Sequence, residues 1–221
     1  MAQLCPPVNY LKTLFFIFLL SATQSVIGDA NPNKINILVF GDSLSAAYNI
    51  PTETSWVHLL QESLITKKID SLVSNASISG ETSSGGLVRF QSQIDKSKPN
   101  IVILELGAND GLRGFDLQTT RNNLITMIEM SHKMGAHVIL AGIHIPPNYG
   151  RTYTQKFYQI YSDLAEMEKV SLIPFILDGV ATHKEFMLDD GLHPNEEGQK
   201  IIVKTVLKHL LPVIECKRSK N

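Results

Sequence analysis

Three residue types that together perform nucleophilic catalysis occur in two short stretches of the sequence. Ser43 stands in "GDSLS", directly after an apolar run, and Asp190 and His193 stand in "DDGLHPN" near the other end of the chain. A serine hydroxyl is a weak nucleophile until a base removes its proton, and histidine is the better base when a carboxylate fixes its tautomer. Because two residues separate Asp190 from His193, one tight turn can present both side chains. The spacing therefore favours a Ser43, His193 and Asp190 triad for acyl transfer.

Acyl transfer also requires hydrogen-bond donors aimed at the negatively charged oxygen of its tetrahedral intermediate. Gly80 in "NASISGETSSGG" lets a backbone N–H approach closely because it has no side chain, and Asn109 in "GANDG" offers an amide N–H. With the backbone N–H of Ser43 these groups form the expected oxyanion hole. The residues around Ser43 do not read G-x-S-x-G, which argues against the nucleophile elbow of α/β-hydrolases.

Each of these residues has an alternative interpretation. Ser43 could cap a helix, as serine often does. Asp189, beside Asp190, could orient His193 in its place. Asn109 and the aspartate that follows it, Asp110, could be turn residues, and the glycine could serve backbone freedom alone.

No metal, cofactor or nucleic acid is expected as a partner. Lys and Arg number 20 against 21 Asp and Glu, without a basic stripe, so a small molecule or lipid is the expected partner. The segment "GETSSGG" lacks the "GK[ST]" of a phosphate-binding loop. The remaining histidines have no metal-ligand spacing and are expected to be surface or core residues: His58, His132, His137, His144, His183 and His209.

Apolar stretches of strand length alternate with segments of helical periodicity. The apolar stretches span residues 35–40, 71–77, 101–107, 137–143 and 171–177, and the helical patterns span roughly 55–66, 84–94, 117–134, 153–168 and 195–211. This alternation predicts an α/β fold with a parallel sheet between layers of helices, and Asp116 is the expected cap of the third helix. Ligands of such sheets bind at the carboxyl ends of the strands, where all four polar stretches fall.

Residues 1–28 have the layout of a cleaved secretory signal peptide, followed by one domain over residues 29–221. Lys12 precedes an apolar run at 14–22, and small or polar residues follow it. The run is short for a bilayer core of about 30 Å, although an uncleaved anchor or a buried N-terminal helix remains the alternative. We therefore expect a periplasmic or secreted protein without stable membrane insertion. Loss of Cys5 with the leader would leave Cys216 alone, so no internal disulfide is expected.

The four blocks together resemble the GDSL, or SGNH, hydrolase family in order and spacing. They are "GDSLS", the Gly80 segment, "GAND" and "DGLHP", and "ELGANDGLRG" and "PPNYGRTY" are similar to its bacterial secreted branch of thioesterases, lysophospholipases and arylesterases. The resemblance implies a flavodoxin-like α/β/α sandwich with a five-stranded parallel sheet. It also implies a cofactor-free hydrolase of acyl esters, acyl thioesters and lysophospholipids, working through an acyl-enzyme, and we expect a monomer. The alternatives are a carbohydrate O-deacetylase of the same family and an exported acyl- or lipid-binding protein without turnover.

The loop "IHIPPNYGRTY" follows the fourth apolar stretch and is expected at the same sheet edge as Ser43. Its residues Ile145, Pro146 and Tyr149 are the predicted substrate-binding residues, because exposed apolar side chains beside a polar cluster suggest a binding surface. Two prolines stiffen the loop and limit the entropy lost when a flexible chain docks. The alternative is that Ile145 and Tyr149 only pack beneath the next helix.

Expression in a Gram-negative host tests the leader. The protein should accumulate in the periplasm and be 28 or 30 residues shorter than encoded, because cleavage is expected after Gly28 or Ala30. Intact-mass spectrometry of the periplasmic fraction measures the length. As a control, Ile17→Arg interrupts the apolar run and should leave the protein in the cytoplasm. Recovery of exported protein that still carries Met1 would contradict the prediction.

Overall fold

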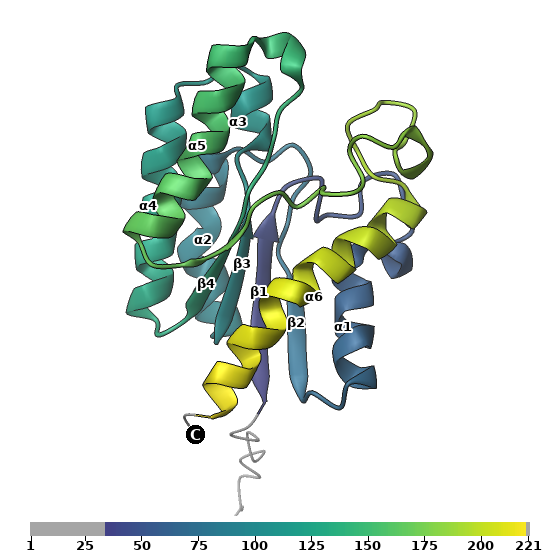
Figure 1. Cartoon of the computed structure of the whole chain (residues 1–221). Helices are drawn as coiled ribbons and strands as arrows, with labels where there is room; N and C mark the ends of the chain where they lie inside the picture. The colour runs from purple at the N-terminus through teal and green to yellow at the C-terminus, as the bar shows by residue number, and fades with distance from the viewer. Residues whose placement is uncertain (1–33, 220–221) are drawn as a thin grey trace, which may run out of the picture. The chain divides into compact units, whose positions relative to one another are not determined.

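A computed structural model of the protein describes residues 34–219. The expected leader and the last two residues lie outside the described part of the chain, so the boundary at residue 28 stays a prediction. Five strands form one parallel sheet in the order β2-β1-β3-β4-β5 (Figure 1). The strands are β1 (Ile35–Gly41), β2 (Ser71–Asn75), β3 (Ile101–Glu105), β4 (His137–Ala141) and β5 (Ser171–Ile173).

Helices cover both faces of this sheet (Figure 1). One face packs against α2 (Ser83–Ser97), α4 (Leu117–Lys133) and α5 (Arg151–Met167), and the other packs against α1 (Trp56–Thr66) and α6 (Glu196–Arg218). The predicted three-layer α/β/α sandwich with five parallel strands is therefore confirmed. Within residues 34–219, no helix combines the length and the apolar character needed to cross a membrane.

Alternate side chains of the central strands enter two separate hydrophobic cores. Ile37 and Ile103 belong to the core under α1 and α6, whereas Leu38 and Leu104 belong to the core under α2, α4 and α5. Every residue of β3 is buried, while the edge strand β2 is only partly covered. Full burial of one such side chain contributes about 1.5–3 kcal/mol, so the two cores hold the carboxyl edge of the sheet in a fixed position.

Two helix ends show where the local sequence predicts a helix boundary correctly and where it does not. The predicted cap Asp116 accepts a hydrogen bond from the Thr119 N–H at 2.8 Å, at the start of α4. The last helix, however, does not end at residue 211 but continues through Pro212 to Arg218. Proline removes a helical hydrogen bond at a cost of about 3 kcal/mol. Burial of Leu210 and Ile214 on either side of it, in the core under α6, offsets that cost.

The strands β4 and β5 are shorter than the apolar stretches that predicted them. Strand β5 ends at Ile173 because Pro174 has no N–H to donate to the sheet. Strand β4 ends at Ala141, and the Gly142 N–H donates to the Ile173 carbonyl at 2.8 Å. A Cβ at Gly142 would lie 2.2 Å from the Pro174 carbonyl oxygen, so only glycine fits where the chain leaves the sheet toward the "IHIPPN" loop.

A short helix that the sequence pattern did not predict follows β3. It is α3 (Ala108–Leu112), and it begins after Gly107, whose φ of 123° is unfavourable for any other residue. The apolar stretch therefore stops being a strand at Glu105, two residues earlier than expected. This change of direction places Asn109 on a helical turn directly above the end of the strand.

Candidate active site

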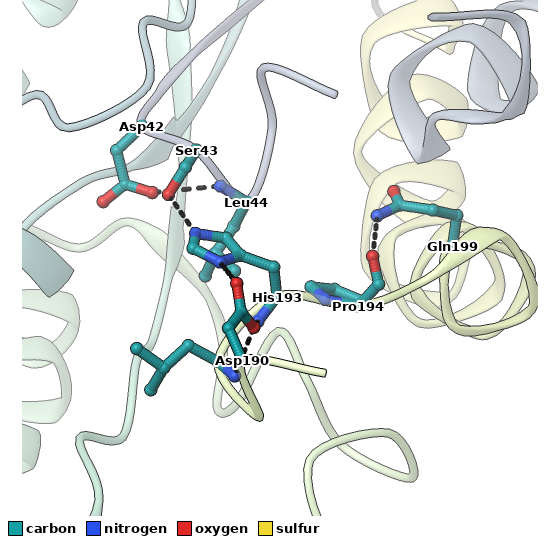
Figure 2. Close-up of polar contacts among 8 residues, drawn as sticks. Asp42, Ser43, Leu44, Asp190, His193, Pro194 and Gln199 are labelled. Atoms are coloured by element: carbon teal, nitrogen blue, oxygen red, sulfur yellow. Dashed lines mark hydrogen bonds and ion pairs between the residues drawn. The ribbon is translucent and has the colours of Figure 1, made fainter. Parts of the chain in front are cut away.

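Ser43 follows β1 in a tight turn that its neighbours hold in place. The Asp42 carboxylate accepts the Leu44 N–H at 3.1 Å and closes the turn around Ser43. The first α-helix after this turn is α1, whose cap is Ser55. The alternative that Ser43 caps a helix is therefore wrong, and its hydroxyl points toward His193 (Figure 2).

A continuous line of hydrogen bonds joins the three residues of the predicted triad. The Ser43 Oγ lies 2.8 Å from the Nε2 of His193, and the Nδ1 of His193 lies 2.7 Å from the Asp190 Oδ2 (Figure 2). The structure thus places Asp190 against the imidazole, in the position for which Asp189 was the alternative. This order of atoms is the one in which a base can take the serine proton while a carboxylate orients the base.

One six-residue turn carries both His193 and Asp190. The Asp190 Oδ1 accepts the backbone N–H groups of Leu192 and His193, both at 2.9 Å. The turn closes where the Leu188 N–H donates to the His193 carbonyl at 2.7 Å, and Gly191 supplies the positive φ of 65° that it needs. The spacing of two residues between base and carboxylate is therefore built into one local structure.

The surroundings of Asp190 keep it ionised. Burial alone would raise its pKa, but hydrogen bonds from the His193 and Leu192 N–H groups and from the His193 ring outweigh burial and lower the pKa. A carboxylate at this place accepts the proton on the His193 Nδ1. The lone pair of the other ring nitrogen, Nε2, is then free to accept the Ser43 proton.

The predicted oxyanion donors lie around the same cavity as Ser43. Gly80 has a φ of 79°, and its carbonyl accepts a hydrogen bond from the Arg113 guanidinium at 3.1 Å. The Asn109 Nδ2 donates to the Asp42 Oδ2 at 3.3 Å, which leaves its second amide hydrogen for another acceptor. Between residues 34 and 219, the backbone N–H groups of Ser43 and Gly80 find no acceptor within hydrogen-bond distance. Three potential donors therefore belong to residues that line the cavity beside the hydroxyl.

Tyr48 contacts the candidate base and was not singled out from the sequence. Its ring stacks on the His193 ring with the centroids 4.2 Å apart and the planes tilted by 32°. The contact restricts the imidazole to the orientation that reaches Ser43 and shields one of its faces from water. Nothing in the sequence around "SAAYN" indicates this contact, because it depends on how the loop after Ser43 meets the distant turn that carries His193.

The candidate active site opens into a cavity of about 260 Å³. Its polar wall holds Ser43 and His193 of the predicted triad and the predicted oxyanion residues Gly80 and Asn109. Its other wall is apolar and comes from five separate segments, which contribute Leu44, Leu112, Ile143, Leu177 and Leu192 among others. The arrangement can hold an apolar group beside a nucleophile and hydrogen-bond donors.

The predicted substrate-binding residues differ in where they lie. Ile145 and Pro146 line the cavity, but Ile145 is only 6% exposed and also belongs to the core beside Phe157. The expectation of an exposed Ile145 is therefore wrong, and its burial agrees with the alternative of packing beneath the next helix. Tyr149 is exposed and lines neither this cavity nor the one beside it.

A second cavity, of about 600 Å³, adjoins the first behind the "IHIPP" loop. The two cavities share five lining residues: His144, Ile145, Pro146, Leu177 and Leu192. His144 lies between the rings of Tyr158 and Phe175, with centroid distances of 4.1 and 4.4 Å, and burial lowers its pKa. The histidine therefore contributes a neutral aromatic surface, in keeping with its predicted structural role.

Two acidic residues near the site have positions that the sequence interpretation missed. Asp110 is not a simple turn residue, because its buried carboxylate accepts both the N–H and the Oγ–H of Ser83, at 2.8 and 2.6 Å. It thereby fastens α3 to the start of α2. Glu105 is fully buried behind Ser43. The sequence feature that could have identified it is a charged residue near the end of the apolar run "IVILEL". Across residues 34–219, no group of three or more potential ligands could hold a metal ion.

Comparisons with known proteins agree with this geometry. The chain is 44% identical to an arylesterase of Vibrio mimicus over 92% of its own length and 98% of the relative. It is 39% identical to thioesterase 1/protease 1/lysophospholipase L1 of Escherichia coli strain K12, over 80% of its own length and 84% of the relative.

Solved structures of esterases have the same fold. The crystal structure of TesA matches with a TM-score of 0.78 and 43% identity, over 80% of this chain and 98% of that one. The structure of the psychrotrophic esterase EstA of Pseudoalteromonas sp., inhibited by monoethylphosphonate, matches with a TM-score of 0.78 and 37% identity. The match covers 83% of this chain and 99% of that one. The family model of the GDSL-like lipases and acylhydrolases matches residues 39–201, which include every residue of the site and all of the sheet except the first part of β1. The chain belongs to the GDSL-like lipase/acylhydrolase family.

Proposed function

We propose that the protein, after removal of its leader, hydrolyses acyl esters and acyl thioesters, lysophospholipids among them, through an acyl-enzyme on Ser43. The observation that carries the proposal is the unbroken line of hydrogen bonds from the Ser43 Oγ through His193 to Asp190 at an apolar cavity. The relatives named arylesterase and thioesterase 1/protease 1/lysophospholipase L1 support the same reaction class.

In the first half of the reaction the Ser43 Oγ attacks the carbonyl carbon of the substrate. The Nε2 of His193 takes the hydroxyl proton, and Asp190 stabilises the resulting imidazolium. The carbonyl oxygen becomes an oxyanion that accepts hydrogen bonds from Asn109 and from the N–H groups of Ser43 and Gly80. When the intermediate collapses, the bond to the leaving oxygen or sulfur breaks, and His193 donates its proton to that atom. The alcohol or thiol departs, and the acyl group remains on Ser43.

Water completes the cycle by the same route. His193 takes a proton from a water molecule, whose oxygen attacks the acyl carbon, and a second oxyanion forms at the same donors. Collapse of this intermediate breaks the bond to the Ser43 Oγ, which recovers its proton from His193. The products are a carboxylic acid and the starting enzyme.

The apolar cavity wall favours an acyl group over a sugar. The segments that contribute Leu44, Ile143, Leu177 and Leu192 offer apolar surface rather than hydrogen-bond partners for hydroxyl groups. This composition disfavours the carbohydrate O-deacetylase alternative. The non-catalytic acyl-binding alternative would require an incomplete set of catalytic residues, whereas hydrogen bonds here connect all three residues of the predicted triad.

Covalent labelling tests the nucleophile. A fluorophosphonate probe should label the wild-type protein at Ser43, and Ser43→Ala should abolish labelling and lower kcat on the order of 10⁴- to 10⁶-fold with the fold intact. Peptide mass mapping identifies the labelled residue, and circular dichroism checks the fold. Ser84→Ala, at an exposed serine that does not line the cavity, is the matched control and should retain labelling. An active Ser43→Ala enzyme would exclude the mechanism.

Two adjacent aspartates provide a matched test of the carboxylate. Asp190→Asn should lower kcat about 10⁴-fold, because an amide no longer holds the His193 tautomer that accepts the serine proton. Asp189→Asn removes the same charge one residue earlier and should change kcat by less than about threefold. Steady-state kinetics on a nitrophenyl ester measures both. Equal losses in the two variants would mean that the turn needs negative charge in general, rather than a carboxylate on His193.

Profiles of kcat/KM against acyl-chain length test whether the acyl chain fills the first cavity and then extends into the second. Each buried methylene contributes about 0.8 kcal/mol, so kcat/KM should rise about fourfold per CH₂ until the second cavity is full. Ala181 lines only the second cavity, and Ala181→Phe should remove the gain for medium and long chains while acetyl and butyryl esters react as before. This variant is a sharper test than Ile145→Ala, because truncation of the buried Ile145 would also cost about 2–5 kcal/mol of stability.

Tyr149→Ala is the control for this test, because Tyr149 is exposed and lines neither cavity. Its profile should match that of the wild-type enzyme at every chain length. If Ala181→Phe loses the same fraction of kcat/KM with all esters, the second cavity does not receive the acyl chain.

A further inference from the structure

Two carboxyl side chains lie fully buried directly behind the candidate nucleophile. Asp42 and Glu105 are both 0% exposed, one just past the end of β1 and the other at the end of β3, where Gly41 pairs with Glu105. A Cβ at Gly41 would lie 2.6 Å from the Glu105 Oε2, so the Glu105 carboxyl lies against the backbone of β1. The mechanism above uses neither carboxyl as a reacting group.

The two carboxyls differ in the partners of their oxygens. Both oxygens of Asp42 accept hydrogen bonds, one from the Leu44 N–H at 3.1 Å and one from the Asn109 amide at 3.3 Å. The Glu105 Oε2 bonds to the Ser45 Oγ at 2.7 Å, with the Asp42 N–H 3.4 Å away. Its Oε1 is buried without a hydrogen-bond partner among the described residues.

A buried carboxylate with an unpartnered oxygen is costly, whereas a neutral carboxylic acid tolerates one far better. The bond to Ser45 suits the neutral acid as well as the carboxylate, because a hydroxyl can accept a hydrogen bond from a protonated Glu105 Oε2 or donate one to it. Asp42 is in the opposite situation, since its two N–H donors favour the carboxylate. The hydrogen bonds therefore place the negative charge on Asp42 and a proton on Glu105.

The surrounding charges act in the same direction. Burial raises the pKa of Glu105 well above its usual value, and the charge of Asp42 raises it further. Burial also raises the pKa of Asp42, to about 7, against the hydrogen bonds from Leu44 and Asn109. Two like charges in one dry site cannot both be stable, so the pair loses its first proton near pH 7, from Asp42, and keeps the second, on Glu105, at higher pH.

Other ionisable groups face the pair from the neighbouring elements, and several of them are acidic. Asp110 on α3 and Glu81 before α2 both disfavour a negative charge on Asp42. Burial, together with acidic neighbours that include Asp42 and Asp110, raises the pKa of Tyr161 on α5, so this hydroxyl stays neutral. The Glu81 carboxylate is itself paired with Arg89 of α2. On the far side of Ser43 lies His193, the proposed base. These neighbours reinforce the preference for a single charge.

We infer that Glu105 is a positioning residue of the oxyanion hole, which carries a proton during turnover and so keeps Asp42 as the carboxylate that holds the Asn109 amide. An ionised Glu105 would compete with Asp42 for that role and place a second negative charge behind the forming oxyanion. The inference rests on the proposed function for its effect on turnover, while the proton on Glu105 can be measured without turnover.

Two substitutions separate the proton from the space that the side chain fills. Glu105→Leu removes the partner of the Ser45 Oγ and should lower kcat roughly tenfold to hundredfold, with KM little changed, because the donors act on the transition state. Glu105→Gln is a permanently neutral analogue and should recover most of that loss. The wild-type kcat should fall at alkaline pH as Glu105 ionises, whereas the Gln variant should lack this decline. Glu53→Gln makes the same change at an exposed position and is the control.

Stability against pH gives a readout that does not depend on catalysis. Folded wild-type protein retains a proton that the unfolded chain releases above the usual glutamate pKa of 4.5. Its stability therefore falls as pH rises from that value toward the raised pKa, and the unfolding equilibrium constant grows up to about tenfold per pH unit. In urea unfolding, the free energy of unfolding of Glu105→Gln should change less with pH than that of the wild type. The pH dependence of Glu53→Gln should match that of the wild type.

The inference would be overturned if the free energy of unfolding depended on pH equally in the wild type and in Glu105→Gln. It would also be overturned if Glu105→Gln folded but had a kcat as low as that of Glu105→Leu. If neither variant folds, carbon-13 NMR of glutamate-labelled wild-type protein decides. One carboxyl that stays protonated at neutral pH supports the inference, and ordinary titration of every glutamate overturns it. A wild-type protein without esterase activity would defeat the proposed function, but the pH dependence of unfolding and the NMR titration would still decide whether Glu105 carries the proton.

Discussion

The backbones of β1 and β3 meet at Gly41 and Glu105 with no room for one more carbon atom. A Cβ on the glycine would lie 2.5 Å from the Glu105 carbonyl oxygen. This contact fixes the level at which both strands leave the sheet, because the residues that follow each strand start from the same paired position. Ser43 stands two residues beyond one strand and Asn109 four residues beyond the other, so the candidate nucleophile and the candidate oxyanion donor inherit their separation from the sheet.

Polar anchors extend this fixed geometry into the loops. The Asn75 amide at the end of β2 donates to the Ser45 carbonyl at 2.7 Å, and buried Asp110 joins α3 to Ser83 on α2. Asp110 and Ser83 are buried, and their hydrogen bonds stiffen the edge while offsetting the cost of removing these groups from water. The donors around Ser43 are thus in place before a substrate arrives, which is the condition for strong electrostatic stabilisation of a transition state.

Sequence reasoning predicted the sheet and the meeting of Ser43, Asp190 and His193, since parallel strands bring their carboxyl ends to one edge whatever the details of packing. It failed where tertiary contacts outweigh local signals. Helix α6 continues through a proline because buried residues on both sides hold it, and Ile145 is buried where the loop composition suggested exposure. The stacking of Tyr48 on the imidazole joins segments far apart in the chain, so no local pattern records it.

The turn at residues 188–193 holds its own carboxylate and imidazole together, yet only one hydrogen bond to the Ser43 Oγ ties that imidazole to the nucleophile. Base and orienting group consequently travel as one unit whenever the turn moves. The turn is largely exposed and lies outside both cores, which places its opening at the low end of the local free energies of the molecule. Opening of the turn would therefore separate the candidate base and its carboxylate from Ser43 together, while the sheet stays folded.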